Sequence, residues 1–183
     1  MITMITTILQ DIPHEIVQLP AKAILLEAGN VATDIFLVRT GCLRSSFNAD
    51  GKDVTLQFFM SGHPVASFDS LVHSTPSEYS IETILPSEVA IIKGLDFKEW
   101  LESHPEQLTH GLHFAMDRLS AYQKLFLSQI KDTPQKRYEA LLKEHPEIIA
   151  QIPQHYIASY LGIIFCHFYN FYFFHRQYSL KKL

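Results

Sequence analysis

Residues 105–131 form one uninterrupted amphipathic stretch, which constrains the fold more than any other part of the chain. Apolar side chains recur there every three or four residues, and this spacing places them on one face of an α-helix. At about 1.5 Å per residue such a helix spans roughly 40 Å, longer than most helices of globular proteins. The members of the apolar stripe are Leu108, Leu112, Ala115, Leu119, Tyr122, Phe126 and Ile130.

A helix of this kind is either buried in the core of one domain or paired with the same helix of a second copy. The alternating spacing of the stripe is close to the a/d seam of a coiled coil, which favours the second role. We therefore predict a homodimer. The residues expected at its helix contact are Leu112, Ala115, Leu119, Tyr122 and Phe126.

Before this helix, between residues 23 and 93, the hydrophobic pattern has a period of two and is broken by glycine and proline. About seven short strands at regular spacing predict an all-β sandwich or roll. Asp50-Gly51 predicts a tight hairpin, because these residues tolerate the positive φ that such turns require. Ahead of the first strand, we expect one or two helical turns over residues 11–17. The clearest strands are residues 24–26, 35–38, 42–47, 54–59, 78–84 and 88–92.

After the long helix the pattern predicts short helices. Thr133 precedes Pro134, a combination typical of a helix start, and this helix should run to Glu144. A second helix, residues 154–161, ends at Gly162, which is how a helix-turn-helix begins. The fold class is therefore α+β, with a sensor domain over residues 1–103, a long helix over 104–131 and a helix-turn-helix region over 132–183.

Composition excludes several classes of protein. The net charge of −4 argues against a chain that binds nucleic acid over its whole surface, although a small local DNA-reading surface fits. Cys42 and Cys166 have no CxxC spacing, which suits a reducing compartment and not a disulfide scaffold. We see no signal peptide and no apolar run of about 20 residues, the length of a membrane span. We expect a cytoplasmic protein without membrane contact.

Histidine is frequent, with ten residues, but no metal site is indicated. His110 and His113 share a face of the long helix, yet no carboxylate or thiol completes a zinc spacing. We predict no metal and no cofactor.

Three stretches resemble the Crp/Fnr family of bacterial transcription regulators. Residues 35–65 read IFLVRTGCLRSSFNADGKDVTLQFFMSGHPV and are similar to the family's cyclic-nucleotide-binding β-roll, with Gly29, Gly41 and Gly62 at its structural turns. The long helix is similar to the family's dimerisation helix. Residues 135–163, QKRYEALLKEHPEIIAQIPQHYIASYLGI, resemble the start of its winged helix-turn-helix. The likeness covers about residues 20–163 and is closest to members of the Bacteroidetes type.

The resemblance implies a double-stranded β-helix, or jelly roll, that binds a small-molecule effector. Members that bind cyclic AMP hold its phosphate with a Gly-Glu pair and an Arg-Ser pair, and residues 65–69 and 77–79 contain neither pair. Glu78 would repel a phosphate there, so we predict no tight binding of cyclic AMP. The effector is an unknown small molecule, and the alternative is a filled or solvated loop. The residues expected to face a pocket are Phe58, Ser67, Ser77 and Tyr79.

The resemblance ends near Ile163. Family members continue with a Thr-Pro start and a recognition helix of Ser and Arg residues, whereas residues 163–183 hold eight aromatics and one arginine. One hypothesis is a truncation or shifted reading frame, which would leave the winged helix-turn-helix incomplete. Contacts with the DNA backbone are expected from the first helix of the unit, at Gln154, Tyr156 and Ser159.

Three functions remain to be weighed. The first is a Crp/Fnr-type DNA-binding regulator, and the second is a ligand-binding or protein-interaction module without DNA binding. The third, an enzyme on a cupin-like roll, needs a His/Glu metal set, and the strand residues 24–59 and 79–92 contain no histidine. Ser67, Asp69 and His73 lack the elbow that holds a catalytic serine. We therefore expect no enzymatic activity and no catalytic residue.

Overall fold

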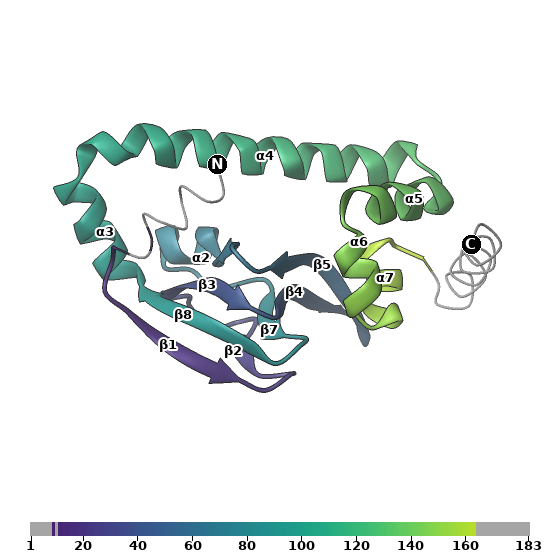
Figure 1. Ribbon diagram of the computed structural model, residues 1–183, viewed down its shortest axis with the longest axis horizontal. Helices are drawn as coiled ribbons and strands as arrows, with labels where there is room; N and C mark the ends of the chain where they lie inside the picture. Colours follow the sequence, from purple (N-terminus) through teal and green to yellow (C-terminus); the bar gives the residue numbers. More distant parts are fainter. Residues whose placement is uncertain (1–8, 10, 164–183) are drawn as a thin grey trace, which may run out of the picture. The chain divides into compact units, whose positions relative to one another are not determined.

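Between residues 14 and 93, apolar and polar residues tend to alternate, and these segments form β-strands. Many of the strands pair with strands that are distant in the sequence. The structure, a computed structural model, describes residue 9 and residues 11–163 (Figure 1). In this part of the chain, eight strands form two sheets with the orders β1-β8-β3-β6 and β2-β7-β4-β5. The strands are β1 His14–Leu19, β2 Ile24–Leu26, β3 Asp34–Thr40, β4 Cys42–Ala49, β5 Lys52–Met60, β6 Pro64–Val65, β7 Ser80–Thr83 and β8 Ser87–Lys93.

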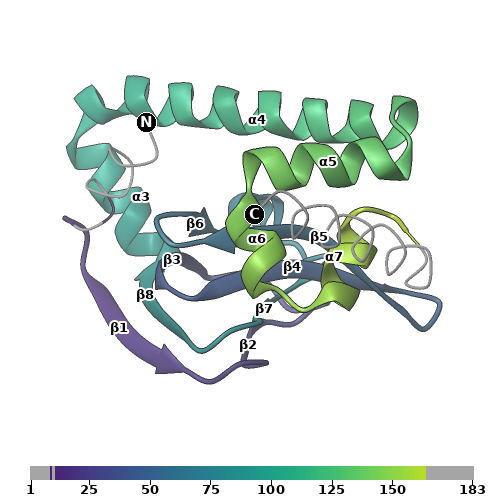
Figure 2. The same ribbon diagram turned by 45° about the vertical axis from the view of Figure 1, so that its right-hand side comes forward.

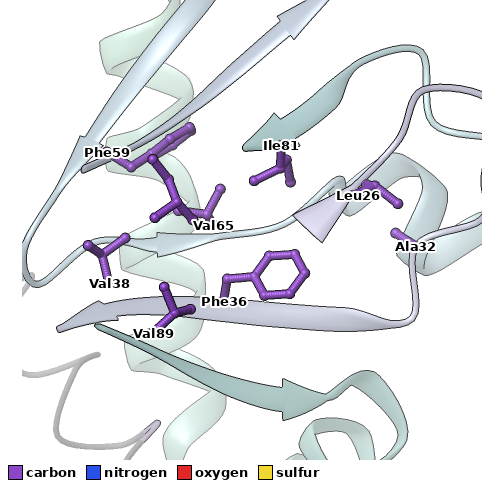
Figure 3. Close-up of a cluster of buried hydrophobic side chains, with 9 residues drawn as sticks. Leu26, Ala32, Phe36, Val38, Phe59, Val65, Ile81 and Val89 are labelled. Atoms are coloured by element: carbon purple, nitrogen blue, oxygen red, sulfur yellow. The ribbon is translucent and has the colours of Figure 1, made fainter. Parts of the chain in front are cut away.

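The core of the roll lies between the two sheets. Figure 3 shows its side chains pointing toward one another from strands of both sheets. Their burial removes apolar surface from water, which is the main favourable term in folding. The buried members of this cluster are Leu26, Ala32, Phe36, Val38, Leu43, Phe59, Val65, Ile81 and Val89.

The first sheet is covered on its other face as well. A second cluster joins Ile35, Leu37 and Ile92 to Phe97 and Trp100 of helix α3, Gly94–Ser103. Residues 35–38 of strand β3 are thus buried on both faces, which explains why this part of the strand is continuously apolar and does not alternate. The predicted α+β fold with a jelly roll and a long helix is confirmed.

Two turns follow from backbone chemistry that the sequence already indicates. Asp50 and Gly51 have φ of 52° and 84°, so the predicted hairpin between β4 and β5 is confirmed. Gly41, between β3 and β4, has φ of 85°, and a Cβ there would lie 2.5 Å from the carbonyl oxygen of Pro86. Only glycine fits this position without displacing the backbone.

Two local predictions are wrong. The helical turns expected over residues 11–17 are absent, because His14–Leu19 forms β1 and pairs antiparallel with β8 along its whole length. The segment taken as a polar loop after Ser67 contains a short helix, α2, at Phe68–His73. Both choices depend on tertiary pairing, which overrides local propensity.

The long helix is present as expected. Helix α4 runs from Leu108 to Lys131, after a single 3-10 turn at Pro105–Gln107. No residue of α4 is buried. A helix with an apolar stripe and no buried residue leaves that stripe in contact with water.

The chain divides into two units by compactness. The first unit contains residues up to Phe47 and Leu56–Ala121, and the second contains Asn48–Thr55 and the residues from Tyr122 onward. The tip of the β4–β5 hairpin therefore belongs to the second unit, and α4 is continuous from one unit into the other. The domain limits at residues 103 and 131 stay a prediction.

In the described residues of the second unit, three short helices follow α4. They are α5 Pro134–Glu144, α6 Pro146–Gln151 and α7 Gln154–Tyr160. The oxygen of the Thr133 side chain accepts the backbone N–H of Lys136 at 3.4 Å, so the predicted cap is confirmed. Helix α6 was not predicted, because the sequence indicated no helix between Glu144 and residue 154. The guanidinium of Arg137 donates to the carbonyl oxygen of Leu161 at 2.8 and 3.0 Å, which ties α5 to the end of α7.

Candidate functional site

The predicted pocket residues around α2 come together as a hydrogen-bonded cluster. The hydroxyls of Ser67 and Ser77 lie 2.9 Å apart, and both side chains are buried. The Ser77 hydroxyl also lies 2.7 Å from the carbonyl oxygen of Tyr79, and the Tyr79 hydroxyl donates to the carbonyl of Ala66 at 3.2 Å. Their hydrogen bonds are thus made within the cluster, which fixes the segment between α2 and β7.

A cavity of about 440 Å³ lies beside this cluster and not inside it. Its floor is apolar and includes Leu26, Ala32 and Phe36 of the roll's core, while polar side chains stand at its rim. Its volume is in the range of small-molecule sites. The lining residues are Ile24, Leu25, Leu26, Glu27, Asn30, Val31, Ala32, Thr33, Asp34 and Phe36. None of the four predicted pocket residues is among them, and Phe58 is buried in β5.

The cavity loop, residues 27–33, is bound to the segment that carries the cluster. The backbone N–H of Gly29 donates to the carbonyl of Ser77 at 2.7 Å, and the N–H of Ser77 donates to the carbonyl of Asn30 at 2.9 Å. The N–H of Ala32 donates to the hydroxyl of Ser70 in α2 at 2.8 Å. The cavity wall and the serine cluster are therefore joined by hydrogen bonds. The sequence marked this loop only as a turn, so its role as a cavity wall was missed.

The charges at the cavity disfavour an anion. Its two charged lining residues, Glu27 and Asp34, are both acidic. The ammonium of Lys93 lies 2.9 Å from a carboxylate oxygen of Asp34, and this hydrogen bond raises the pKa of the exposed lysine above its ordinary value. Glu27 adds negative charge at the rim, and the described residues that line the cavity include no lysine or arginine.

Arg44 is a buried arginine of the roll, and it is already paired. Its Nε and Nη2 lie 2.7 and 2.5 Å from the same carboxylate oxygen of Glu82. The two residues face each other in register across β4 and β7. A buried arginine neutralised in this way does not offer its charge to a phosphate in the cavity.

The predicted dimer residues on α4 are all exposed. The exposed fractions are 60% for Leu112, 59% for Leu119, 48% for Tyr122 and 67% for Phe126, and Ala115 is exposed as well. Other large apolar residues extend the same helix surface: Leu108, Met116, Leu127 and Ile130. The helix thus presents an apolar strip that nothing in the described chain covers.

The residues predicted to contact DNA have different surroundings. Gln154 is half-buried at the start of α7, whereas Tyr156 is buried. The Ser159 hydroxyl is bonded to the backbone of the β4–β5 hairpin, at Asp53 and Thr55. The aromatic stretch that led to the truncation hypothesis lies, from residue 164 on, outside the described residues.

Two further observations concern the described residues only. They contain no group of three or more His, Cys, Asp or Glu placed to hold a metal ion. None of their helices combines the length and hydrophobicity that crossing a membrane requires.

Comparison with known proteins agrees with this architecture. Residues 16–104 match the family model described as cyclic nucleotide-binding domain. The sequence matches no curated protein.

Solved structures extend the likeness beyond the roll. FixK2 from Bradyrhizobium japonicum is 16% identical, with a TM-score of 0.75 over 87% of this chain and 82% of that one. A regulator assigned to the Crp/Fnr family from Eubacterium rectale is 18% identical, with a TM-score of 0.70 over 96% and 82%. The c-di-GMP responsive global regulator CLP from Xanthomonas campestris is 16% identical, with a TM-score of 0.69 over 91% and 88%. Residues 16–104 thus resemble a cyclic nucleotide-binding domain, and the chain has the fold that these solved regulators share.

Proposed function

We propose that this protein is a homodimeric transcription regulator whose β-roll senses a small molecule and whose helix-turn-helix binds DNA. The observation that carries the proposal is the exposed apolar strip of α4, a helix that continues from the sensor unit into the unit with α7. Effector binding in the roll would shift the paired helices and so reorient the two DNA-binding heads. The proposal includes a cytoplasmic location, where such a regulator meets its DNA.

Dimerisation follows from the cost of leaving the strip in water. Eight large apolar residues of α4 are about half exposed or more in the single chain: Leu108, Leu112, Met116, Leu119, Tyr122, Phe126, Leu127 and Ile130. Contiguous apolar surface of this kind marks an interaction site. The spacing of the stripe fits a second copy of the same helix, since a and d residues then interlock along the seam.

The effector we propose is a small molecule that is neutral or positively charged. The cavity has an apolar floor, two acidic lining residues and no basic one, and Arg44 is already paired with Glu82. Asp34 is paired with Lys93, so the repulsion that a phosphate would meet comes chiefly from Glu27, and it adds to the loss of hydration. Cyclic AMP, and also the c-di-GMP named for the similar CLP protein, are therefore expected not to bind tightly.

DNA binding is tested by a gel-shift titration of the full chain against its own upstream region and a scrambled control of equal length. A two-fold dimer requires a palindromic site with half-sites about one helical turn apart. We expect sequence-dependent binding that weakens steeply as salt increases, because phosphate contacts release counterions. Equal binding to both DNAs, or none, would reject DNA recognition by this chain.

A ligand-binding or protein-interaction module without DNA activity is the alternative. It is favoured by one observation, namely that Ser159, a predicted DNA contact, is bonded to the hairpin of its own chain. This alternative predicts a dimer by light scattering together with no specific gel shift. In both cases the protein is a regulator or a binding module and not an enzyme.

A further inference from the structure

One serine of α7 completes the open edge of a β-sheet. The backbone N–H of Thr55 donates to the Ser159 hydroxyl at 2.9 Å, and that hydroxyl donates to the carbonyl oxygen of Asp53 at 3.0 Å. Among the described residues, strand β5 is the last strand of its sheet, so no described strand lies on one of its sides. Two residues apart on a strand, an N–H and a C=O point to the same side. Ser159 therefore takes the place of the missing strand at this point.

Serine has the chemistry that this position requires. A hydroxyl offers one donor and two acceptor lone pairs, so a single side chain can satisfy both backbone groups. Thr55 is buried, with 3% of its surface exposed, and a buried N–H without a partner is costly. Alanine at position 159 would remove both of these hydrogen bonds, whereas threonine would keep a hydroxyl.

The hairpin tip is held in a defined shape. Asp50 and Gly51 form its tight turn, and the side-chain oxygen of Asn48 accepts the N–H of Gly51 at 2.7 Å. The tip, Asn48–Thr55, belongs to the same compact unit as α7, and the views agree in placing α7 beside this hairpin (Figure 2). The same strand continues to Phe59, which lies in the core of the roll. The contact thus joins α7 to the start of β5 within one compact unit.

We propose that Ser159 is a positioning residue that clamps α7 onto the edge of β5, and that this clamp withholds the Ser159 hydroxyl from DNA. The effect of the clamp on DNA binding rests on the proposed function, whereas the contact between Ser159 and β5 does not depend on it. While the Ser159 hydroxyl is bonded to Asp53 and Thr55, its proton is not available to a DNA phosphate. The clamped state is therefore the resting state, and DNA binding by α7 competes with the hairpin.

The clamp is tested by amide hydrogen exchange at Thr55 in the full chain, compared among wild type, Ser159→Ala and Ser159→Thr. We expect about tenfold faster exchange in Ser159→Ala, since two hydrogen bonds of ordinary strength are lost. Ser159→Thr should restore most of the protection. Ser120→Ala, at an exposed position of α4, is the matched control and should leave the exchange of Thr55 unchanged. Unchanged exchange in Ser159→Ala would overturn the clamp.

A gel shift with the same variants separates this inference from the proposed function. If the clamp opposes DNA binding, Ser159→Ala binds the upstream DNA more tightly than wild type, and Ser159→Thr behaves like wild type. Weaker binding of Ser159→Ala would overturn the resting-state role and make Ser159 a direct DNA contact. Faster exchange of Thr55 in a protein that never binds DNA would support the clamp and reject the proposed function.

Discussion

At the scale of single residues, Gly41 has no room for a side chain. Its φ of 85° is unfavourable for other residues, and a Cβ would collide with the backbone of Pro86 and the side chain of Ser87. We expect Gly41→Ala to lower the free energy of unfolding by about 3 kcal/mol or more, measured by urea denaturation.

Gly51→Ala is the matched control for this substitution. Gly51 has nearly the same φ, 84°, but no atom lies within 4 Å of a Cβ built there. It should lose only about 1–2 kcal/mol, the cost of the left-handed backbone for a residue other than glycine. Equal losses in the two variants would mean that the contact with Pro86 and Ser87 does not matter.

Cys42 gives the chain a dependence on alkaline pH. Burial raises the pKa of its thiol from 9.0 to about 12 in the folded protein. Between these values the unfolded chain releases the proton and the folded chain retains it, so stability is complete below pH 9 and is lost as pH rises toward 12. We expect the free energy of unfolding of wild type to fall more steeply over this interval than that of Cys42→Ala. Parallel curves would show that the thiol ionises alike in both states.

The sequence alone predicted those features of single residues that depend only on neighbouring residues in the chain. The positive φ at Gly29, Gly41, Gly51 and Gly62 follows from glycine itself and from turn chemistry. The partners of Ser159 could not be predicted, because they lie 104 and 106 residues away in the chain. The four predicted pocket residues were chosen from the family resemblance. Their role stays a prediction, because the observed cavity is lined by other residues.

At the scale of elements, α4 carries the clearest test. Ala115 lies on the apolar stripe, and Ala121 is exposed on the same helix but off the stripe. We expect Ala115→Lys to convert the proposed dimer to monomer at micromolar concentration, because a lysine would be buried unpaired in the proposed seam. Ala121→Lys adds the same charge to the same helix and should remain dimeric. Light scattering distinguishes the two, and identical masses for both variants would contradict a seam through Ala115.

Elements with a strong period of their own were predicted well, and elements that depend on neighbours were not. Helices α4, α5 and α7 have apolar residues at helical spacing, and all three are present. Thr133 separates α4 from α5, and Gly162 follows the end of α7. Strand β1 was mistaken for helical turns, since only its pairing with β8 makes it a strand. Helices α2 and α6 are six residues long, too short for a periodic signal.

At the scale of the whole molecule, effector choice can be tested by thermal unfolding. A ligand that binds only the folded state at 100 times its Kd stabilises it by about 2.7 kcal/mol, which shifts Tm by several degrees. We expect cyclic AMP and c-di-GMP at millimolar concentration to leave Tm unchanged, because the cavity is lined by Glu27 and Asp34 without a basic residue. Calorimetric titration with cyclic AMP is the direct check, and micromolar affinity would refute the charge argument.

By itself, the sequence determined the period of each long element, the turns that only glycine can make and the apolar strip of α4, since these depend on residues close together in the chain. Only the tertiary structure decided which loop walls the cavity, which carboxylate neutralises Arg44 and what occupies the edge of β5. The physical reason is that the cavity, the buried charge of Arg44 and the edge of β5 arise only when the strands have assembled into sheets. An open edge, a buried charge and a cavity exist only after distant segments have packed, and their partners are then chosen by proximity in space.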